Sequence, residues 1–266
     1  MAALLKSGQI VSNLFFDDPC LVFALCREAV PFLRLFPPHQ RFPGAPCWAR
    51  FCGPSWLTVL VLQTGVGIEA ARRAMRWLLD RPVLGNVPYQ PKVVLSVGFC
   101  GALREGYQIG DVILASEIVD SKGNGWPVTW PREWPTGEWR PPLHRARLAT
   151  SPSLVSTLDQ KRTLAEQSGA AVVDMESGVL AQLCRQAGIP FGCLRVVSDD
   201  WQMPISPSLA GCLRGRGVDP VRLLAAVVRS PRLLVEIWRL ARQTRQAARQ
   251  LGTALGEVLT LTKNEG

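Results

Sequence analysis

Two segments decide the fold class of this chain: VVDMES, at residues 172–177, and PFGCLRVVSDD, at residues 190–200. Their apolar residues predict buried strands at 171–173 and 191–197, and acidic residues follow each strand. Helical spacing over residues 175–187 separates the strands, and Gly188 and Pro190 end that helix. A strand, a helix and a second strand in this order indicate an α/β protein, in which ligands bind at the carboxyl ends of strands.

The alternation of strands and helices extends over most of the chain. Apolar runs predict further strands at residues 21–25, 56–62, 92–97 and 111–119. Helical spacing predicts further helices at residues 68–80 and 159–168. Together these elements predict an α/β fold whose sheet is largely buried.

The C-terminal part differs in charge and in pattern. The formal net charge is +9, and nine arginines against two acids lie between Arg214 and Arg249. Ser230 and Pro231 predict the N-cap and first residue of a long helix, with apolar residues on one arc and the arginines from Arg232 to Arg249 on another. We therefore predict a main domain over residues 20–218 and a basic amphipathic helical extension over residues 219–262.

The composition excludes several classes of protein. A hydrophobic fraction of 47% excludes a disordered chain, and no apolar stretch approaches the roughly 20 residues of a membrane-spanning helix. With two His and no C-x-x-C pair among eight Cys, we expect no zinc cluster and predict the buried, reduced thiols of a cytoplasmic protein. The first residues have no secretory signal pattern.

Residues 121–144 fit neither a strand nor a helix period. The segment is rich in proline and contains four of the nine tryptophans: Trp126, Trp130, Trp134 and Trp139. We predict a long functional loop here, because tryptophan at this density argues against plain disorder.

Several turns and acids lie where a ligand could bind. The turns at residues 65–67, 98–101 and 198–199 each follow a predicted strand, and none matches G-x-G-x-x-G or the P-loop. Four acids lie at element boundaries: Glu28, Asp174, Glu176 and Asp199. Each acid alone is equally explained as a solvated or capping residue, Asp174 above all as an N-cap. The four acids together favour an acid–base site.

The chain resembles the nucleoside phosphorylase and nucleosidase superfamily over roughly residues 20–200. The resemblance rests on the DMES motif at residues 174–177 and the GFCGAL loop at residues 98–103. The basic, leucine-rich C-terminal helix is similar to that of the hopanoid-associated branch, which removes adenine from adenosylhopane. The resemblance implies a three-layer fold with a mixed, twisted central sheet flanked by helices, a catalytic domain over residues 20–218, and the C-terminal helical extension.

The resemblance also implies roles for individual residues. Asp199 matches the acid that acts at N7 of the leaving purine, and Glu28 falls where hydrolytic members activate water. Glu176 matches the carboxylate that holds the ribose hydroxyls, and Met175 packs against the sugar. The implied substrate-binding set also includes Phe99, Gly98, Val173 and Ser198.

The chain departs from the phosphate-using members at two positions. Those members tend to have an arginine and a serine where this chain has Ser96 and Phe99. A phenylalanine side chain offers no donor to a phosphate dianion, which needs several. The departure, together with Glu28, favours water over phosphate as the nucleophile.

Alternatives remain open for both parts of the chain. The domain is a nucleosidase, a phosphate-dependent phosphorylase, or a nucleoside-binding module without catalysis; we expect no cofactor and no metal, with phosphate only as a co-substrate. The C-terminal helix packs on the domain or joins the segment from Trp126 to Trp139 on a membrane surface. Nucleic-acid binding is disfavoured, because no reader motif accompanies the arginines. The resemblance implies a homo-oligomer, in the cytoplasm or peripheral on the inner face of its membrane.

Overall fold

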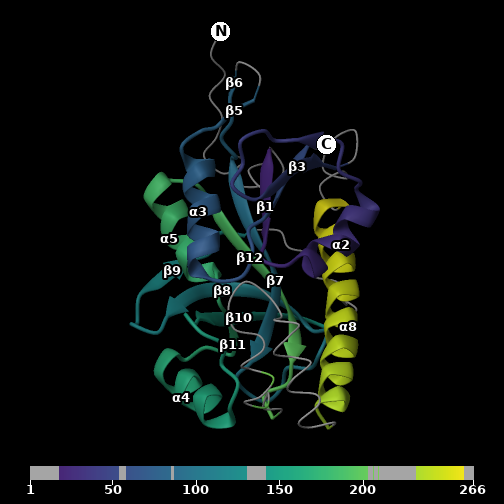
Figure 1. The fold of residues 1–266 in the computed structure, drawn as a ribbon. Helices are drawn as coiled ribbons and strands as arrows, with labels where there is room; N and C mark the ends of the chain where they lie inside the picture. The colour runs from purple at the N-terminus through teal and green to yellow at the C-terminus, as the bar shows by residue number, and fades with distance from the viewer. Residues whose placement is uncertain are drawn as a thin grey trace.

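A mixed sheet runs through the middle of the protein (Figure 1). The structure is a computed structural model that describes residues 18–53, 58–84, 87–130, 142–202, 206, 209 and 232–260. In sheet order, the strands are β11 (Val172–Asp174), β10 (Leu143–Thr150), β8 (Val112–Asp120), β12 (Phe191–Asp199), β7 (Val93–Ala102), β1 (Pro19–Phe23), β4 (Val59–Gln63), β3 (Trp48–Cys52) and β2 (Gln40–Arg41). A short strand, β9 (Gly125–Pro127), pairs with β8, and β5 (Val83–Leu84) forms a separate pair with β6 (Val87–Pro88).

One part of the sheet closes on itself. Strand β11 pairs with β10 on one side and antiparallel to β7 on the other. The ring of β7, β12, β8, β10 and β11 is therefore a small barrel, and β1, β4, β3 and β2 extend from it as an open sheet. Strands β7 and β12 belong to the barrel and lie side by side in parallel, so the end of one is close to the end of the other.

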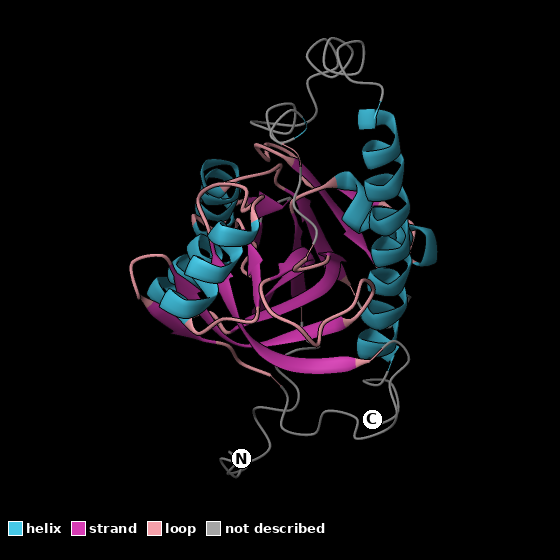
Figure 2. Ribbon diagram, turned by 90° about the horizontal axis from the view of Figure 1, so that it is seen from below, coloured by secondary structure: helices cyan, strands magenta, loops and turns pink. Residues whose placement is uncertain are grey.

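Helices cover both faces of the sheet (Figures 1 and 2). One face carries α3 (Ile68–Leu79) and α5 (Ser177–Ala187); the other carries α2 (Cys26–Leu35) and α8 (Arg232–Thr260), while α4 (Leu158–Ser168) lies beside the barrel. The alternation along β1 explains the two layers, because Cys20 and Val22 pack in the core under α3 while Leu21 and Phe23 pack under α2 and α8. The predicted three-layer α/β fold with a C-terminal helix is confirmed.

Several predictions about local structure are wrong, among them the turn at residues 198–199, which are the last two residues of β12. Residues 98–101, expected as a turn, lie inside β7, because Gly98 and Gly101 pair with Arg195 and Asp199 of β12 and the sheet hydrogen bonds outweigh the turn preference of glycine. Residues 121–144, expected as one loop, contain β9 and the start of β10, and 131–141 of that segment lie outside the described residues. The helix expected from residue 175 begins at Ser177.

Two of the four tryptophans of that segment lie in the described part of the chain, and neither forms the surface that we expected. Trp126 is buried in the core under α3 and α5. Trp130 is half-buried, and its indole N–H donates to the carbonyl oxygen of Ala115 at 2.7 Å. Trp134 and Trp139 lie outside the described residues. A membrane-facing surface that includes Trp126 is therefore excluded.

Helix α8 has two parts with different surroundings. Its C-terminal half packs on α2 and the sheet through buried Ala247, Leu251, Ala254, Leu255 and Val258. Its N-terminal half presents three large apolar side chains to solvent, with exposed fractions of 55% for Leu234, 69% for Val235 and 65% for Trp238. The predicted single apolar arc is wrong at Leu234, which points away from the core. None of the helices in the described part of the chain has an apolar stretch that could cross a membrane.

Candidate active site

Glu28 lies in the first turn of α2 and joins that helix to β7. Its Oε2 accepts hydrogen bonds from the backbone N–H groups of Ala24 (3.0 Å) and Leu25 (2.7 Å), and its Oε1 accepts one from Phe99 N–H at 2.8 Å. The residue is 4% exposed, and burial raises the pKa of its carboxyl, while the N–H donors and the charge of Arg195 oppose that rise. Glu28 thus serves as a helix cap and is also a buried carboxyl suited to proton exchange.

Asp199 is the last residue of β12 and lies against β7 at Gly101. Its Oδ2 accepts a hydrogen bond from the ammonium of Lys161 at 2.7 Å, and its Oδ1 accepts one from the hydroxyl of Ser198 at 3.3 Å. Burial raises the pKa of the Asp199 carboxyl, and the Lys161 ammonium opposes the rise. A carboxyl whose pKa is raised by burial is a candidate proton donor.

Two glycines of β7 make room for these carboxylates. A Cβ atom on Gly98 would lie 2.5 Å from Oε1 of Glu28, and one on Gly101 would lie 2.8 Å from Oδ2 of Asp199. Because the two glycines are three residues apart, the carboxylates approach β7 at points about 10 Å apart along the strand. Gly98 and Gly101 of the GFCGAL sequence therefore allow Glu28 and Asp199 to approach β7 closely. This close approach, and not a turn, explains why glycine occupies both positions.

Glu176 lies between β11 and α5 and reaches the first turn of α3. Its Oε1 accepts a hydrogen bond from the backbone N–H of Gly67 at 2.6 Å. Burial first, and then the nearby charge of Asp174, raises the pKa of its carboxyl to about 8. Gly67 has φ +94°, a backbone conformation that favours glycine, so the tight turn before α3 points its N–H at Glu176.

A small cavity of about 10 Å3 is lined by Glu28 and Glu176. Ser96, Phe99 and Arg195 also line it, as does Gly98. Asp199 and Ser198 are not among its lining residues. A wider, open hollow over α3, α5 and β9 contains none of the three carboxylates. The cavity therefore unites Glu28, Glu176, Gly98 and Phe99, while Asp199 lies further along β7.

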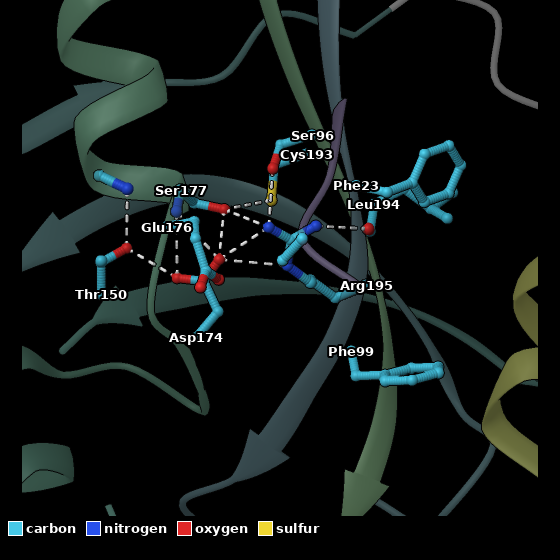
Figure 3. Close-up of polar contacts among 12 residues, drawn as sticks. Phe23, Ser96, Phe99, Thr150, Asp174, Glu176, Ser177, Cys193, Leu194 and Arg195 are labelled. Carbon is cyan, nitrogen blue, oxygen red and sulfur yellow. Dashed lines mark hydrogen bonds and ion pairs between the residues drawn. The ribbon is translucent and has the colours of Figure 1, made fainter. Parts of the chain in front are cut away.

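The wall of this cavity contains a buried ion pair (Figure 3). The Arg195 Nη2 donates at 2.7 Å to each of three oxygens: Asp174 Oδ2, Ser96 Oγ and Ser177 Oγ. Asp174 also accepts from the Thr150 hydroxyl at 2.8 Å and from Ser177 N–H at 3.0 Å. The N-cap of α5 is Glu176, so the N-cap position considered for Asp174 is wrong. Asp174 accepts from the first N–H of the helix and fixes the guanidinium beside the cavity.

The remaining predicted residues occupy other surroundings. Val173 is buried in a separate cluster with Leu103 and Val119. Met175 is half-buried between β11 and α5, next to Glu176 in the chain. The Ser198 hydroxyl donates to the carbonyl oxygen of Cys100 at 3.2 Å as well as to Asp199. Their assignment to substrate binding stays a prediction.

Sequence reasoning missed two functional candidates, Arg195 and Lys161. Arg195 is 3% exposed in the middle of an apolar strand, and Lys161 is 1% exposed in α4. The position of Arg195 inside an apolar run was a sequence signal that it is buried and paired, since arginine is rarely buried without a partner. Lys161 lies among the polar residues of an amphipathic helix, so its burial has no signal in the sequence. Among the described residues, no group of three or more His, Cys, Asp and Glu could hold a metal ion.

Comparison with known proteins defines the family. Residues 50–160 and 132–204 match the phosphorylase superfamily. The chain is 24% identical over 203 residues to the 5'-methylthioadenosine/S-adenosylhomocysteine nucleosidase of an Exiguobacterium species, a match that covers 65% of this chain and 81% of that protein. The protein therefore belongs to the phosphorylase superfamily.

Solved structures share the fold at low identity. The 5'-methylthioadenosine nucleosidase of Arabidopsis thaliana superposes with a TM-score of 0.66 at 17% identity, covering 93% of this chain and 96% of that one. The Helicobacter pylori futalosine hydrolase superposes with a TM-score of 0.62 at 15% identity, covering 91% and 99% of the two chains. These superpositions show the shared fold, and the family match together with the nucleosidase relatives identifies the protein as an enzyme of the nucleosidase and nucleoside phosphorylase type.

Proposed function

We propose that the protein hydrolyses the N-glycosidic bond of a purine nucleoside. The observation that carries this proposal is a pair of carboxylates, the buried Glu28 and the half-buried Asp199, each of which lies against a glycine of β7. The two glycines are three residues apart, so Glu28 and Asp199 approach β7 at points about 10 Å apart along the strand. The nucleosidase names of the relatives support the same reaction.

Each carboxyl has a separate task in this mechanism. Cleavage passes through a sugar with oxocarbenium character while negative charge builds up on the purine. Asp199 donates a proton to the purine as the bond to the sugar breaks, and Glu28 accepts a proton from the water that attacks the sugar. Glu176 binds the ribose hydroxyls, and its contact strengthens as cationic character develops.

The wall of the cavity favours water over phosphate. Arg195 is the guanidinium there, and its Nη2 already donates to Asp174, Ser96 and Ser177. The Phe99 side chain has no donor, and the Glu28 carboxylate, when ionised, repels an anion. Phosphorolysis is the alternative, and it requires that Arg195 leave part of this network to bind phosphate.

We propose adenosylhopane, or a nucleoside with a similar hydrocarbon group, as the substrate. The exposed Leu234, Val235 and Trp238 of α8 support this choice, because such a group of apolar side chains at a surface marks a contact site. The guanidinium of Arg242 lies over the Trp238 ring, 5.8 Å from its centre, so apolar and basic groups occupy the same stretch of helix. A helix with this composition lies on an anionic membrane, where it places the enzyme close to a lipid-linked nucleoside.

Substrate choice is tested by the rate of adenine release from two nucleosides. Adenosylhopane in vesicles and 5'-methylthioadenosine in solution are supplied separately to the purified full chain. We expect the higher kcat/KM for adenosylhopane. A higher kcat/KM for 5'-methylthioadenosine assigns the protein a short, soluble substrate. If adenine is released from neither nucleoside, the alternative of a nucleoside-binding module without catalysis is favoured.

Membrane attachment is tested by flotation with anionic vesicles. The wild type is expected to float at low salt and less at high salt. Trp238→Gln combined with Val235→Gln is expected to abolish flotation, whereas Val83→Gln, which changes an equally exposed residue far along the chain, is expected to leave it intact. A wild type that stays unbound at low salt refutes the membrane contact.

We also propose that the enzyme forms a homo-oligomer, as the superfamily resemblance implies. Light scattering coupled to size-exclusion chromatography measures the mass directly. The expected mass is a multiple of the 29.2 kDa chain mass, and a mass equal to one chain contradicts the proposal.

A further inference from the structure

Lys161 is buried in α4, although burial of a lysine ammonium is unfavourable by itself. It is 1% exposed, and its ammonium donates to Asp199 Oδ2 at 2.7 Å and to the Asp200 carbonyl oxygen at 2.6 Å. Removing an ammonium group from water is unfavourable unless it is paired and hydrogen-bonded. Both of its partners lie at the end of β12, so the burial of Lys161 is linked to that end of the strand.

The position of Lys161 within α4 also argues for a role outside the helix. The helix begins at Leu158, so Lys161 lies at the end of its first turn. A positive charge near a helix N-terminus is unfavourable, because the helix dipole is positive there. Thr157 and Gln160 form a capping box that fixes this turn. The first turn of α4 is therefore stable without Lys161. This fixed turn holds the Lys161 ammonium against Asp199.

We infer that Lys161 and Asp199 act as one proton-holding pair, in which Lys161 keeps available the proton that Asp199 delivers to the leaving purine. The inference rests on the proposed function of Asp199. A carboxyl alone can donate only while it is protonated, and it loses its proton as the pH rises. The ammonium of Lys161, in contact with Oδ2, supplies a proton to the carboxylate at the moment when charge develops on the purine.

The transfer balances in protons and electrons. As the bond between the sugar and the purine breaks, its electron pair stays on the purine, and the purine takes a proton from Asp199. The Asp199 oxygen takes a proton from the Lys161 ammonium, which becomes a neutral amine. The attacking water loses a proton to Glu28, and proton exchange with solvent returns Glu28 and Lys161 to their starting states. The net reaction is hydrolysis alone.

Few other titratable groups act on this pair. Asp200 follows Asp199 in the chain, and its negative charge raises the pKa of the Asp199 carboxyl. Cys100, on β7, faces the same carboxyl, and burial holds the pKa of its thiol well above the ordinary value, so it remains neutral. The Ser198 hydroxyl donates to Asp199 and does not titrate. Asp199, with the Lys161 ammonium hydrogen-bonded to it, is therefore the carboxyl that we assign to proton exchange at this end of β12.

The test compares the pH dependence of kcat/KM for adenine release in Lys161→Met and the wild type. In the variant, Asp199 must hold the proton by itself, so its activity falls as the pH rises through the pKa of that carboxyl. We expect Lys161→Met to be within about threefold of the wild type at pH 5.5 and at least about tenfold slower at pH 8.5, within the range of general acid catalysis. The ratio of the two rates removes the contribution of Glu28, which the two proteins share.

Control variants separate charge from packing. Lys161→Arg keeps a positive charge, but a guanidinium does not release its proton, so its rate relative to the wild type should also fall as the pH rises; it also tests the inference if Lys161→Met does not fold by circular dichroism. Lys122→Met changes an exposed lysine in the turn between β8 and β9 and should match the wild type throughout. A ratio that is constant with pH for Lys161→Met overturns the inference, and a constant ratio for Lys161→Arg shows that the charge alone is enough and overturns the proton transfer.

Asp199→Asn distinguishes the inference from the proposed function. If that variant keeps the wild-type rate, Asp199 is not the acid and the proposed mechanism fails. If Asp199→Asn is inactive while Lys161→Met shows a constant ratio, Asp199 keeps its role and only the pair with Lys161 is refuted.

Discussion

Gly98→Ala tests whether the exact approach of Glu28 to β7 matters for catalysis. The new Cβ atom would lie 2.5 Å from Oε1 and 2.9 Å from Cδ of Glu28. Nonbonded carbon and oxygen atoms are comfortable at about 3.5 Å, so the carboxylate must withdraw by about 1 Å. Withdrawal lengthens the 2.8 Å hydrogen bond from Phe99 N–H and moves the carboxyl away from the cavity.

The structure sets the expected size of the effect. A displacement of about 1 Å in a catalytic group costs roughly 10²-fold in rate. A buried N–H that loses its acceptor costs about 1–3 kcal/mol of stability, which leaves a folded protein. We therefore expect kcat/KM for adenine release to fall by about 10²-fold while circular dichroism shows a native spectrum and a modestly lower Tm.

Gly256→Ala is the matched control. A Cβ atom there would meet only Leu35 Cδ1 at 3.5 Å, an ordinary contact, and alanine favours the helix α8. Its activity should equal that of the wild type. Retention of more than about a third of the wild-type rate by Gly98→Ala would show that the position of Glu28 is not critical, because a 1 Å shift is expected to cost far more.

Three further predictions concern the carboxyls. Asp199→Asn keeps the side-chain shape without a dissociable proton, so adenine release should fall at least about 10²-fold with little change in Tm; a variant above about a tenth of the wild-type rate contradicts its role as the acid. Glu28→Gln should slow hydrolysis in phosphate-free buffer by about 10²-fold or more, and an unchanged rate there would favour phosphorolysis. Burial raises the pKa of Glu176 from its ordinary value of 4.5 to about 8. The carboxyl therefore contributes stability that is fully present below pH 4.5 and is lost as the pH rises to about 8. The Tm of Glu176→Gln relative to the wild type should therefore rise between pH 5 and pH 8, and a constant difference would contradict the shift.

Local patterns were enough to predict the layers of the fold. The apolar runs of β1, β7 and β12 and the spacing of α3 and α5 reflect burial of one or both faces, which leaves a signal in the sequence itself. The closure of the barrel left no such signal, because it depends on the pairing of β11 with β7, which lie about 70 residues apart in the chain. Helix α2 was missed because its charged residues and Pro31 conceal its short apolar face.

The site was predicted in part for a similar reason. Glu28, Glu176 and Asp199 lie at or near the ends of helices and strands. The strand pattern and the resemblance to the superfamily both indicated these three residues. The glycines 98 and 101 suggested a turn, because a sequence does not show which side chains approach a strand from other elements. The burial of Lys161 likewise depends on how α4 docks beside the end of β12, and no local pattern encodes that docking.

The measurement that tests the central claim most directly is the product analysis of a single purine nucleoside incubated with the purified enzyme, with and without phosphate. If Glu28 activates water and Asp199 protonates the purine, free adenine and free sugar appear at the same rate in both buffers. Formation of a sugar 1-phosphate, with adenine released only when phosphate is present, would contradict hydrolysis.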